Sequence, residues 1–197
     1  KSKIMLKLVF DGLHVSFVPS PMSHLVPQTL NMQVTLDNLP VAKIADQFFA
    51  VAKKQLTSAT QKQEEAKAEV AGAFSKLPRI LQEAGASLTL YNTDLKSDAL
   101  TANFQSRVDA STDAALGASG KVTAVIKGLD ELVHKIQESA LKPGSDPHLL
   151  GYLMGFMTVQ TKGKLGKAAD GASLRNYVIE LKKNGDVMLN GAVASST

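Results

Sequence analysis

Hydrophobic and polar residues alternate along several stretches of the chain, and this two-residue period is typical of β-strands with one buried face. In the clearest stretch, Leu30, Met32, Val34 and Leu36 alternate with polar residues. The same period marks residues 3–10, 13–18, 88–91, 100–105, 122–126, 177–181 and 187–189. Because cleanly alternating strands are typical of antiparallel sheets with one covered face, we expect such a sheet here.

Between the strands, apolar residues recur at helical spacing. The pattern predicts four helices, at residues 39–55, 57–84, 129–140 and 148–160. We expect Pro78 to begin a short separate piece at the end of the second helix, and Gly85 to end that piece as a C-terminal cap. The polar stretch at 57–69 predicts either helix or a solvated extension, and its segment TSATQKQEE at 57–65 would be the tip if the first two helices project as a pair.

The helix at 148–160 is apolar on nearly every side and contains Gly151 and Gly155. One interpretation is a fully buried helix whose glycines allow another element to pack closely. The alternative is the wall of an apolar ligand cavity, because Met and Leu side chains adapt to varied ligands. The residues of that wall would be Leu150, Leu153, Met154, Phe156 and Met157.

The tetrapeptide Gly-Ala-Ser-Leu occurs at Gly85 and again at Gly171, and each copy precedes a predicted hairpin. This self-match predicts an internal repeat. The fold class is then α+β, with antiparallel sheet covered by helices and two repeated β-α-α-β-β units after an N-terminal strand pair. We expect the N-terminal strand pair and its Pro-rich loop at residues 1–28, the first repeated unit at 29–110 and the second at 111–197. Residues 110–120 would link the two units, which would form either one compact body or two interlocked halves. The two hairpins should superpose.

Composition narrows the range of functions. The chain has 197 residues, is 44% hydrophobic, carries a net charge of +4 and contains no Cys, which excludes disulfides and thiolate metal sites. Its Lys residues are scattered among acidic residues, which disfavours nucleic acid as a partner. No apolar run is long enough to span a membrane.

Motifs for catalysis are weak, and we expect neither an enzyme nor a metal or cofactor. The four His residues lie far apart in the sequence, and no pair has the spacing of a helical metal site. Ser139 and Lys142 match S-x-x-K, but they fall at a helix end and no S-D-N or K-T-G follows. The Gly- and Lys-rich segment at 162–171 lacks the P-loop pattern and indicates a flexible connector. The alternative is a surface for anionic headgroups formed by Lys162, Lys164 and Lys167.

Three segments carry a resemblance to a known family: LPRILQEAGASLTLYNTDLK, ASGKVTAVIKGLDELVHKI and ASLRNYVIELKKNGDVMLNG. Over residues 77–194 the chain resembles a Gram-negative envelope family, domain of unknown function 2125. The periplasmic domain of unknown function 945 is the second choice. The resemblance implies a β-rich periplasmic body, with an anchoring or signal segment upstream of Lys1, and it brings no catalytic residues.

These patterns lead to two hypotheses. The first is a non-enzymatic periplasmic or cell-envelope protein that binds a lipid or other amphiphile between its sheet and helices. The second is a protein interaction or assembly module of the envelope that uses the helical projection around residues 57–70. Membrane attachment is expected only through the upstream segment, which would make the inner membrane the place of anchoring.

Overall fold

The computed structural model describes residues 2–12, 26–57 and 63–195. Its nine strands are β1 (Lys3–Asp11), β2 (Thr29–Asp37), β3 (Ser87–Lys96), β4 (Thr101–Ala110), β5 (Ala118–Lys127), β6 (Lys164–Lys167), β7 (Ser173–Leu181), β8 (Val187–Leu189) and β9 (Ala192–Ser195). Its four helices are α1 (Val41–Thr57), α2 (Gln63–Ala84), α3 (Leu129–Ala140) and α4 (His148–Lys162). The predicted strand at 13–18 and residues 58–62 of the predicted tip lie outside the described residues.

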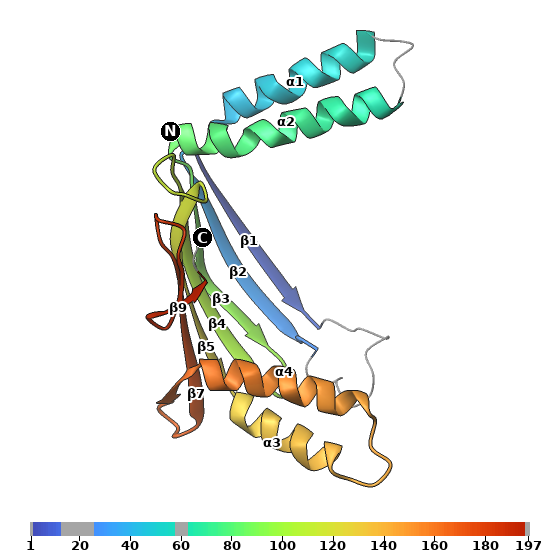
Figure 1. The fold of residues 1–197 in the computed structure, drawn as a ribbon, viewed down its shortest axis with the longest axis vertical. Helices are drawn as coiled ribbons and strands as arrows, with labels where there is room; N and C mark the ends of the chain where they lie inside the picture. The colour runs from blue at the N-terminus through green and yellow to red at the C-terminus, as the bar shows by residue number, and fades with distance from the viewer. Residues whose placement is uncertain (1, 13–25, 58–62, 196–197) are drawn as a thin grey trace.

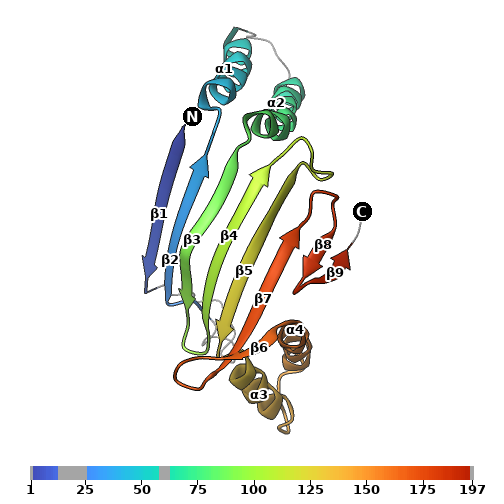
Figure 2. The same ribbon diagram turned by 90° about the vertical axis from the view of Figure 1, so that its left-hand side faces the viewer.

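All strands belong to one antiparallel sheet in the order β1-β2-β3-β4-β5-β7-β8-β9, with β6 paired to β7. Each pair of helices is inserted between two neighbouring strands: α1 and α2 between β2 and β3, and α3 and α4 between β5 and β7. The two helical hairpins therefore lie at opposite ends of the sheet, as Figure 2 shows. The predicted α+β class with an antiparallel sheet is confirmed.

The helices do not cover the sheet as expected. Both hairpins project from the ends of the curved sheet toward the same side, so that the molecule has the outline of a C (Figure 1). We call the side toward which they project the concave face of the sheet and the opposite side the convex face. The two helical hairpins therefore bound the concave face at its two ends.

The α1–α2 hairpin joins the sheet through a sharp turn at Gly85, which has a φ of 60°. The backbone N–H groups of Gly85 and Ala86 donate to the carbonyls of Gln82 and Leu81, which is the Schellman pattern that ends a helix. Gly85 thus ends α2 as predicted. The separate helical piece after Pro78 was a wrong prediction, because α2 continues through Pro78.

The buried core lies at the other end of the sheet, where the α3–α4 hairpin meets β7. Leu129 and Leu132 of α3 are almost wholly buried and pack with Leu153 of α4 and Tyr177 of β7. The Tyr177 hydroxyl donates to the Val159 carbonyl at 2.8 Å, which fixes the ring between sheet and helix. This end of the molecule is therefore a rigid wall.

The predicted repeat is not confirmed. Leu88 and Leu174 occupy the same place in the two Gly-Ala-Ser-Leu copies, but Leu88 pairs with Val108 and lies on the concave face. Leu174 pairs with Lys127 and lies on the convex face. Equivalent residues thus point to opposite faces of one sheet. The expected linker at 110–120 is a short turn, since β4 and β5 pair along their whole length.

Candidate functional site

The concave face is apolar across seven adjacent strands. Because directly opposite residues of antiparallel strands share a face, the strand registers assign its members. The registers also place the polar residues Thr93, Ser106 and Arg175 on this face. Its apolar members are Ile4, Leu6, Leu8, Phe10, Leu30, Met32, Val34, Leu36, Leu88, Leu90, Leu95, Ala102, Phe104, Val108, Val122, Ala124, Ile126, Tyr177, Ile179, Leu181, Val187 and Leu189. The alternation that predicted the strands therefore places nearly all their large apolar residues on one side.

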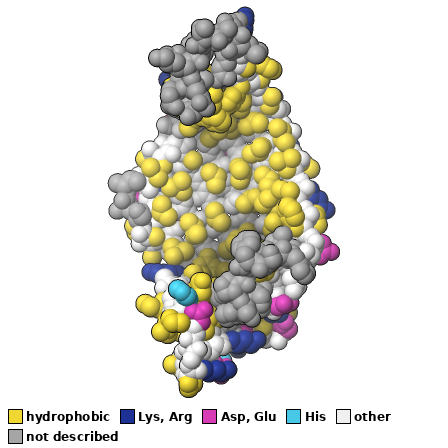
Figure 3. Space-filling model, turned by 90° about the vertical axis from the view of Figure 1, so that its right-hand side faces the viewer, with side chains coloured by type: hydrophobic (Ala, Val, Ile, Leu, Met, Phe, Trp, Pro, Cys, Tyr) yellow, Lys and Arg dark blue, Asp and Glu magenta, His cyan; other side chains and the backbone are white. Residues whose placement is uncertain are grey.

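This face is partly open to solvent: its exposed members lie on β1, at the start of β3 and on β7, whereas Leu90, Phe104 and Val122 on the central strands are half-buried. Figure 3 shows hydrophobic side chains spread over the sheet between the two hairpins. Leu88 on β3 is 38% exposed and Ile179 on β7 is 42% exposed, and Leu6, Leu8 and Phe10 on β1 are also exposed. Only the end beside α3 and α4 is well covered, where Ala124 and Ile126 pack against the core. Among the described residues, no element covers the centre of the concave face.

The size of the face distinguishes it from ordinary surface. Six of its seven strands have nine or ten residues, which gives the whole face a length of about 30 Å and a width of about 30 Å. Part of this footprint of about 900 Å² is covered by α3 and α4. Large exposed apolar patches on soluble proteins often mark interaction sites or ligand-binding grooves.

The convex face has the opposite character. Its positions on β3, β4 and β5 are mostly polar or charged, as in the row Asn103, Gln105 and Arg107 on β4. The half-buried residues Val125, Leu174 and Val178 are exceptions near the centre of the sheet. Exposed apolar residues are therefore fewer on the convex side, where Met5, Val9 and Tyr91 are exposed examples.

Helix α4 forms the end wall of the concave face, since it lies on the side of α3 that faces the hollow (Figure 1). The prediction that α4 is fully buried was wrong, because only Leu149 and Leu153 among its residues are buried. The glycines do not serve close packing either, since a Cβ at Gly151 or Gly155 would meet nothing within 4 Å.

The five predicted wall residues on α4 separate into two groups. Leu153 and Phe156 pack in the core against α3 and β7. Leu150, Met154 and Met157 recur at helical spacing on another side of α4, and all three are exposed. The structure therefore does not bring the five into one cavity lining, but it leaves three of them available beside the concave face.

The predicted headgroup lysines do not form one cluster. Lys162 lies in the last turn of α4, and the segment expected to be a connector contains the strand β6. Lys164 and Lys167 pair with Asn176 and Ser173, which lie on opposite faces of β7. Because two residues three apart on a strand point to opposite sides, the structure does not bring Lys164 and Lys167 onto one face of β6.

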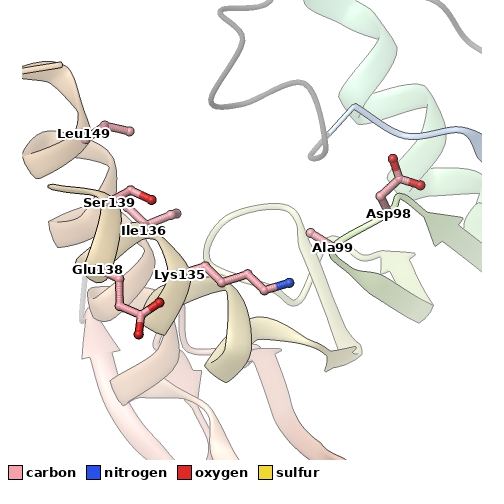
Figure 4. Close-up of a pocket in the computed structure, with 7 residues that line it drawn as sticks. All are labelled: Asp98, Ala99, Lys135, Ile136, Glu138, Ser139 and Leu149. Carbon is pink, nitrogen blue, oxygen red and sulfur yellow. The ribbon is translucent and has the colours of Figure 1, made fainter. Parts of the chain in front are cut away.

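A pocket of about 440 Å³ opens between the β3–β4 turn and the α3–α4 hairpin. In Figure 4, Lys135 extends from α3 toward the turn that carries Asp98 and Ala99. Asp98 accepts a hydrogen bond from Gln28 Nε2 at 2.6 Å. Glu138, Ser139, Ile136 and Leu149 complete the described lining. Lys142, the other residue of the S-x-x-K match, is not among these described lining residues, so the S-x-x-K pair does not meet in this pocket.

A network of polar side chains fixes the α3–α4 wall to the sheet. Arg175 of β7 donates from Nε and Nη2 to the two carboxylate oxygens of Asp130 in α3, at 2.8 and 3.2 Å. Gln160 of α4 donates to the same carboxylate at 2.8 Å. Partial burial raises the pKa of Asp130, but the hydrogen bonds from Arg175 and Gln160 outweigh it and hold the pKa below its ordinary value. The network joins α3, α4 and β7 and stabilises the attachment of the helical hairpin to the sheet.

Within the described residues, no group of His, Asp or Glu side chains is arranged to hold a metal ion. His134 and His148 lie on different helices, while His14 and His24 are outside the described part of the chain. None of the described helices is both long and apolar enough to cross a lipid bilayer.

Comparison of the chain with protein-family models, with curated proteins and with solved structures gave no match. Sequence reasoning missed the main element of the site, which is the sheet face itself. The signal was present in the alternating residues, but the alternation does not say whether an element covers the apolar side.

Proposed function

We propose that the concave face binds the acyl chains of a lipid or a similar amphiphile, and that the protein is a non-enzymatic component of the cell envelope. The observation that carries the proposal is the open apolar sheet surface bounded by two helical hairpins. Aliphatic surface of this size is unstable in water, and covering it supplies about 25 cal/mol for each Å² of apolar area removed from solvent.

The composition of the face favours acyl chains over a protein partner. Protein interfaces are enriched in Tyr, Trp and Arg, with polar groups that form hydrogen bonds across the contact. The concave face consists mainly of Leu, Val, Ile and Met, with Phe10, Phe104 and Tyr177 as its aromatic members. Its length of about 30 Å is twice the about 15 Å that the chains of one bilayer leaflet span.

The second part of the proposal concerns the compartment in which the protein acts. The resemblance of residues 77–194 to an envelope family supports a place in the periplasm, where a lipid-binding protein would shield acyl chains from water. The absence of cysteine is compatible with that compartment.

Lipid retention tests the proposal. Purified protein is mixed with vesicles of equal parts phosphatidylethanolamine and phosphatidylglycerol, the vesicles are removed, and lipid left on the protein is measured by mass spectrometry. The test variant is Leu88→Glu with Ile179→Glu, since both side chains are partly exposed on the concave face. The control is Gln105→Glu, an exposed position on the convex face.

We expect wild type and the convex control to retain lipid, and the concave variant to retain at least about tenfold less, because a carboxylate is strongly disfavoured beside acyl chains. Unfolding curves of all three proteins should be similar. Absence of lipid from every protein, or equal lipid on the two variants, would refute the proposal.

A second candidate function is an assembly module that uses the α1–α2 hairpin. The supporting observation is that this hairpin projects from the sheet and exposes Phe49 and Phe74. Phe74 stacks edge-on against Phe48, with ring centroids 5.2 Å apart, so the hairpin holds its own shape. If it captures an envelope protein, deletion of residues 57–69 should abolish that capture while leaving lipid retention unchanged.

A further inference from the structure

Among the described strands, the two outer edges of the sheet are built differently. At one edge β8 and β9 have three and four residues, and their pairing contains an irregularity. At the other edge β1 has nine residues in unbroken register with β2. Short and irregular edges resist further pairing, whereas a long regular edge exposes a row of backbone hydrogen-bonding groups to another strand.

Strand β1 exposes apolar side chains on both faces of the sheet. Met5 and Val9 lie on the convex face and are 72% and 61% exposed. Elsewhere the convex face is mostly polar, so two large apolar residues at this edge require a separate explanation. On the concave face, Leu6 and Leu8 of the same strand are also exposed. A strand placed alongside β1 would cover residues on both faces at once.

We infer that β1 pairs antiparallel with β1 of a second copy of this chain, about a twofold axis that passes through Lys7 perpendicular to the sheet. In this register Lys3 lies opposite Asp11 of the second copy, and Asp11 opposite its Lys3. Met5 lies opposite Val9 in the same reciprocal way. Opposite charges and apolar pairs directly across antiparallel strands are the combinations that stabilise a sheet.

The same register pairs the apolar residues of the concave face, with Ile4 opposite Phe10 and Leu6 opposite Leu8. The only like-charged pair is Lys7 with its own copy at the axis, on the solvent side, where the two long side chains diverge into water. A register centred on Met5 would instead place Lys3 opposite Lys7 twice. The register centred on Lys7 is the one that uses all nine residues and gives two ion pairs.

This arrangement has a consequence for the binding surface. Since residues directly opposite each other share a face, the concave faces of the two copies lie on the same side of a continuous sheet. The dimer would therefore present one apolar surface of twice the width. The inference stands on the edge strand alone and does not require that the surface binds lipid.

A charge-exchange experiment tests the inference. One variant carries Met5→Lys with Val9→Lys and the other carries Met5→Glu with Val9→Glu. These positions are exposed, so both proteins should fold. Val193→Lys, an exposed position on the opposite edge strand, is the control. The association state is measured by sedimentation equilibrium over a range of protein concentrations.

We expect wild type and the Val193 control to form a concentration-dependent dimer. Each charged variant alone should associate at least about tenfold more weakly, because like charges oppose each other twice across the axis. An equimolar mixture of the two variants should recover the dimer as a heterodimer, since Lys then faces Glu at both pairs.

Three results would overturn the inference: a wild type that stays monomeric at every concentration, a charged variant that dimerises as wild type does, or a mixture that fails to recover the dimer. Dimerisation lost in Leu88→Glu with Ile179→Glu but kept in the edge variants would show association through the concave face, which also contradicts it. Lipid retention by a monomer would leave the proposed function intact and refute only the dimer.

Discussion

Replacing Asp130 by Asn should weaken the attachment of the α3–α4 hairpin to the sheet and lower the free energy of unfolding of the protein. The carboxylate accepts two hydrogen bonds from Arg175 and one from Gln160. Hydrogen bonds to charged groups contribute about 1.5–3 kcal/mol each. Because the Arg175 and Asp130 side chains remain 19% and 21% exposed, solvent screening reduces the loss, and we expect about 2 kcal/mol in total.

The assay is urea unfolding followed by circular dichroism, with thermal unfolding as a second readout. For a chain of this length the expected loss lowers the melting temperature by about 4–8 °C. The matched control is Asp109→Asn, which removes the ion pair of Asp109 with Arg107. Both partners there are largely exposed, so the control should lose less than about 0.5 kcal/mol.

The pH dependence gives the same prediction a second, independent readout. The pKa of Asp130 is lowered in the folded protein, so its contribution is complete above the unfolded pKa of about 3.9 and is lost as the pH falls through the folded pKa. The stability gap between wild type and Asp130→Asn should therefore be constant from about pH 7 to 5 and shrink below about pH 4. A gap no larger than that of the control, or one that persists unchanged to pH 3, would refute the reasoning.

Three further substitutions test the packing by urea unfolding. Leu132→Ala empties a buried site in α3 and should cost about 2–5 kcal/mol, whereas Leu141→Ala, at an exposed position, should cost less than about 0.5 kcal/mol; equal losses would place the core elsewhere. Gly163→Ala would bring a Cβ to 2.6 Å from Cζ of the buried Tyr177 ring, so we expect a loss of about 1–3 kcal/mol, and no loss would mean that the ring is free to move. Gly85→Ala has open space around it but a φ of 60°, so it should cost about 1 kcal/mol through backbone strain alone, and a stabilised variant would contradict the left-handed cap.

Local structure could be predicted well from sequence because it depends on short-range pattern. The alternation at 29–37 predicted β2 with its observed bounds, and the apolar period at 129–140 predicted α3 and its buried residues. The turn at Gly85 followed from the cap preference of glycine. Each of these features is decided by residues close in the chain.

Features that depend on distant strands were missed. The repeated tetrapeptide suggested equivalent units, but strand register decides which face a residue occupies, and a shift of one residue exchanges the faces. Leu88 and Leu174 therefore differ in orientation despite their identical local sequence. A string match contains no information about register.

The environment of α4 was also mispredicted, for a related reason. A helix that is apolar on most sides is normally buried, yet Met154 is 70% exposed. Leu150 and Met157 are exposed with it on the helix that bounds the concave face at one end. Sequence shows that such residues avoid water, but only the arrangement of the hairpins shows that the described fold leaves them uncovered.

The most direct test of acyl-chain binding is to locate the lipid on the protein. Because the sequence has no cysteine, one cysteine can be introduced and labelled with a fluorophore, at Ile179 on the concave face or at Gln105 on the convex face. Vesicles of phosphatidylethanolamine and phosphatidylglycerol containing a phospholipid with a spin-labelled acyl chain are then added. We predict strong quenching of the label at Ile179 and little at Gln105; equal quenching at both positions, or none at Ile179, would contradict the account.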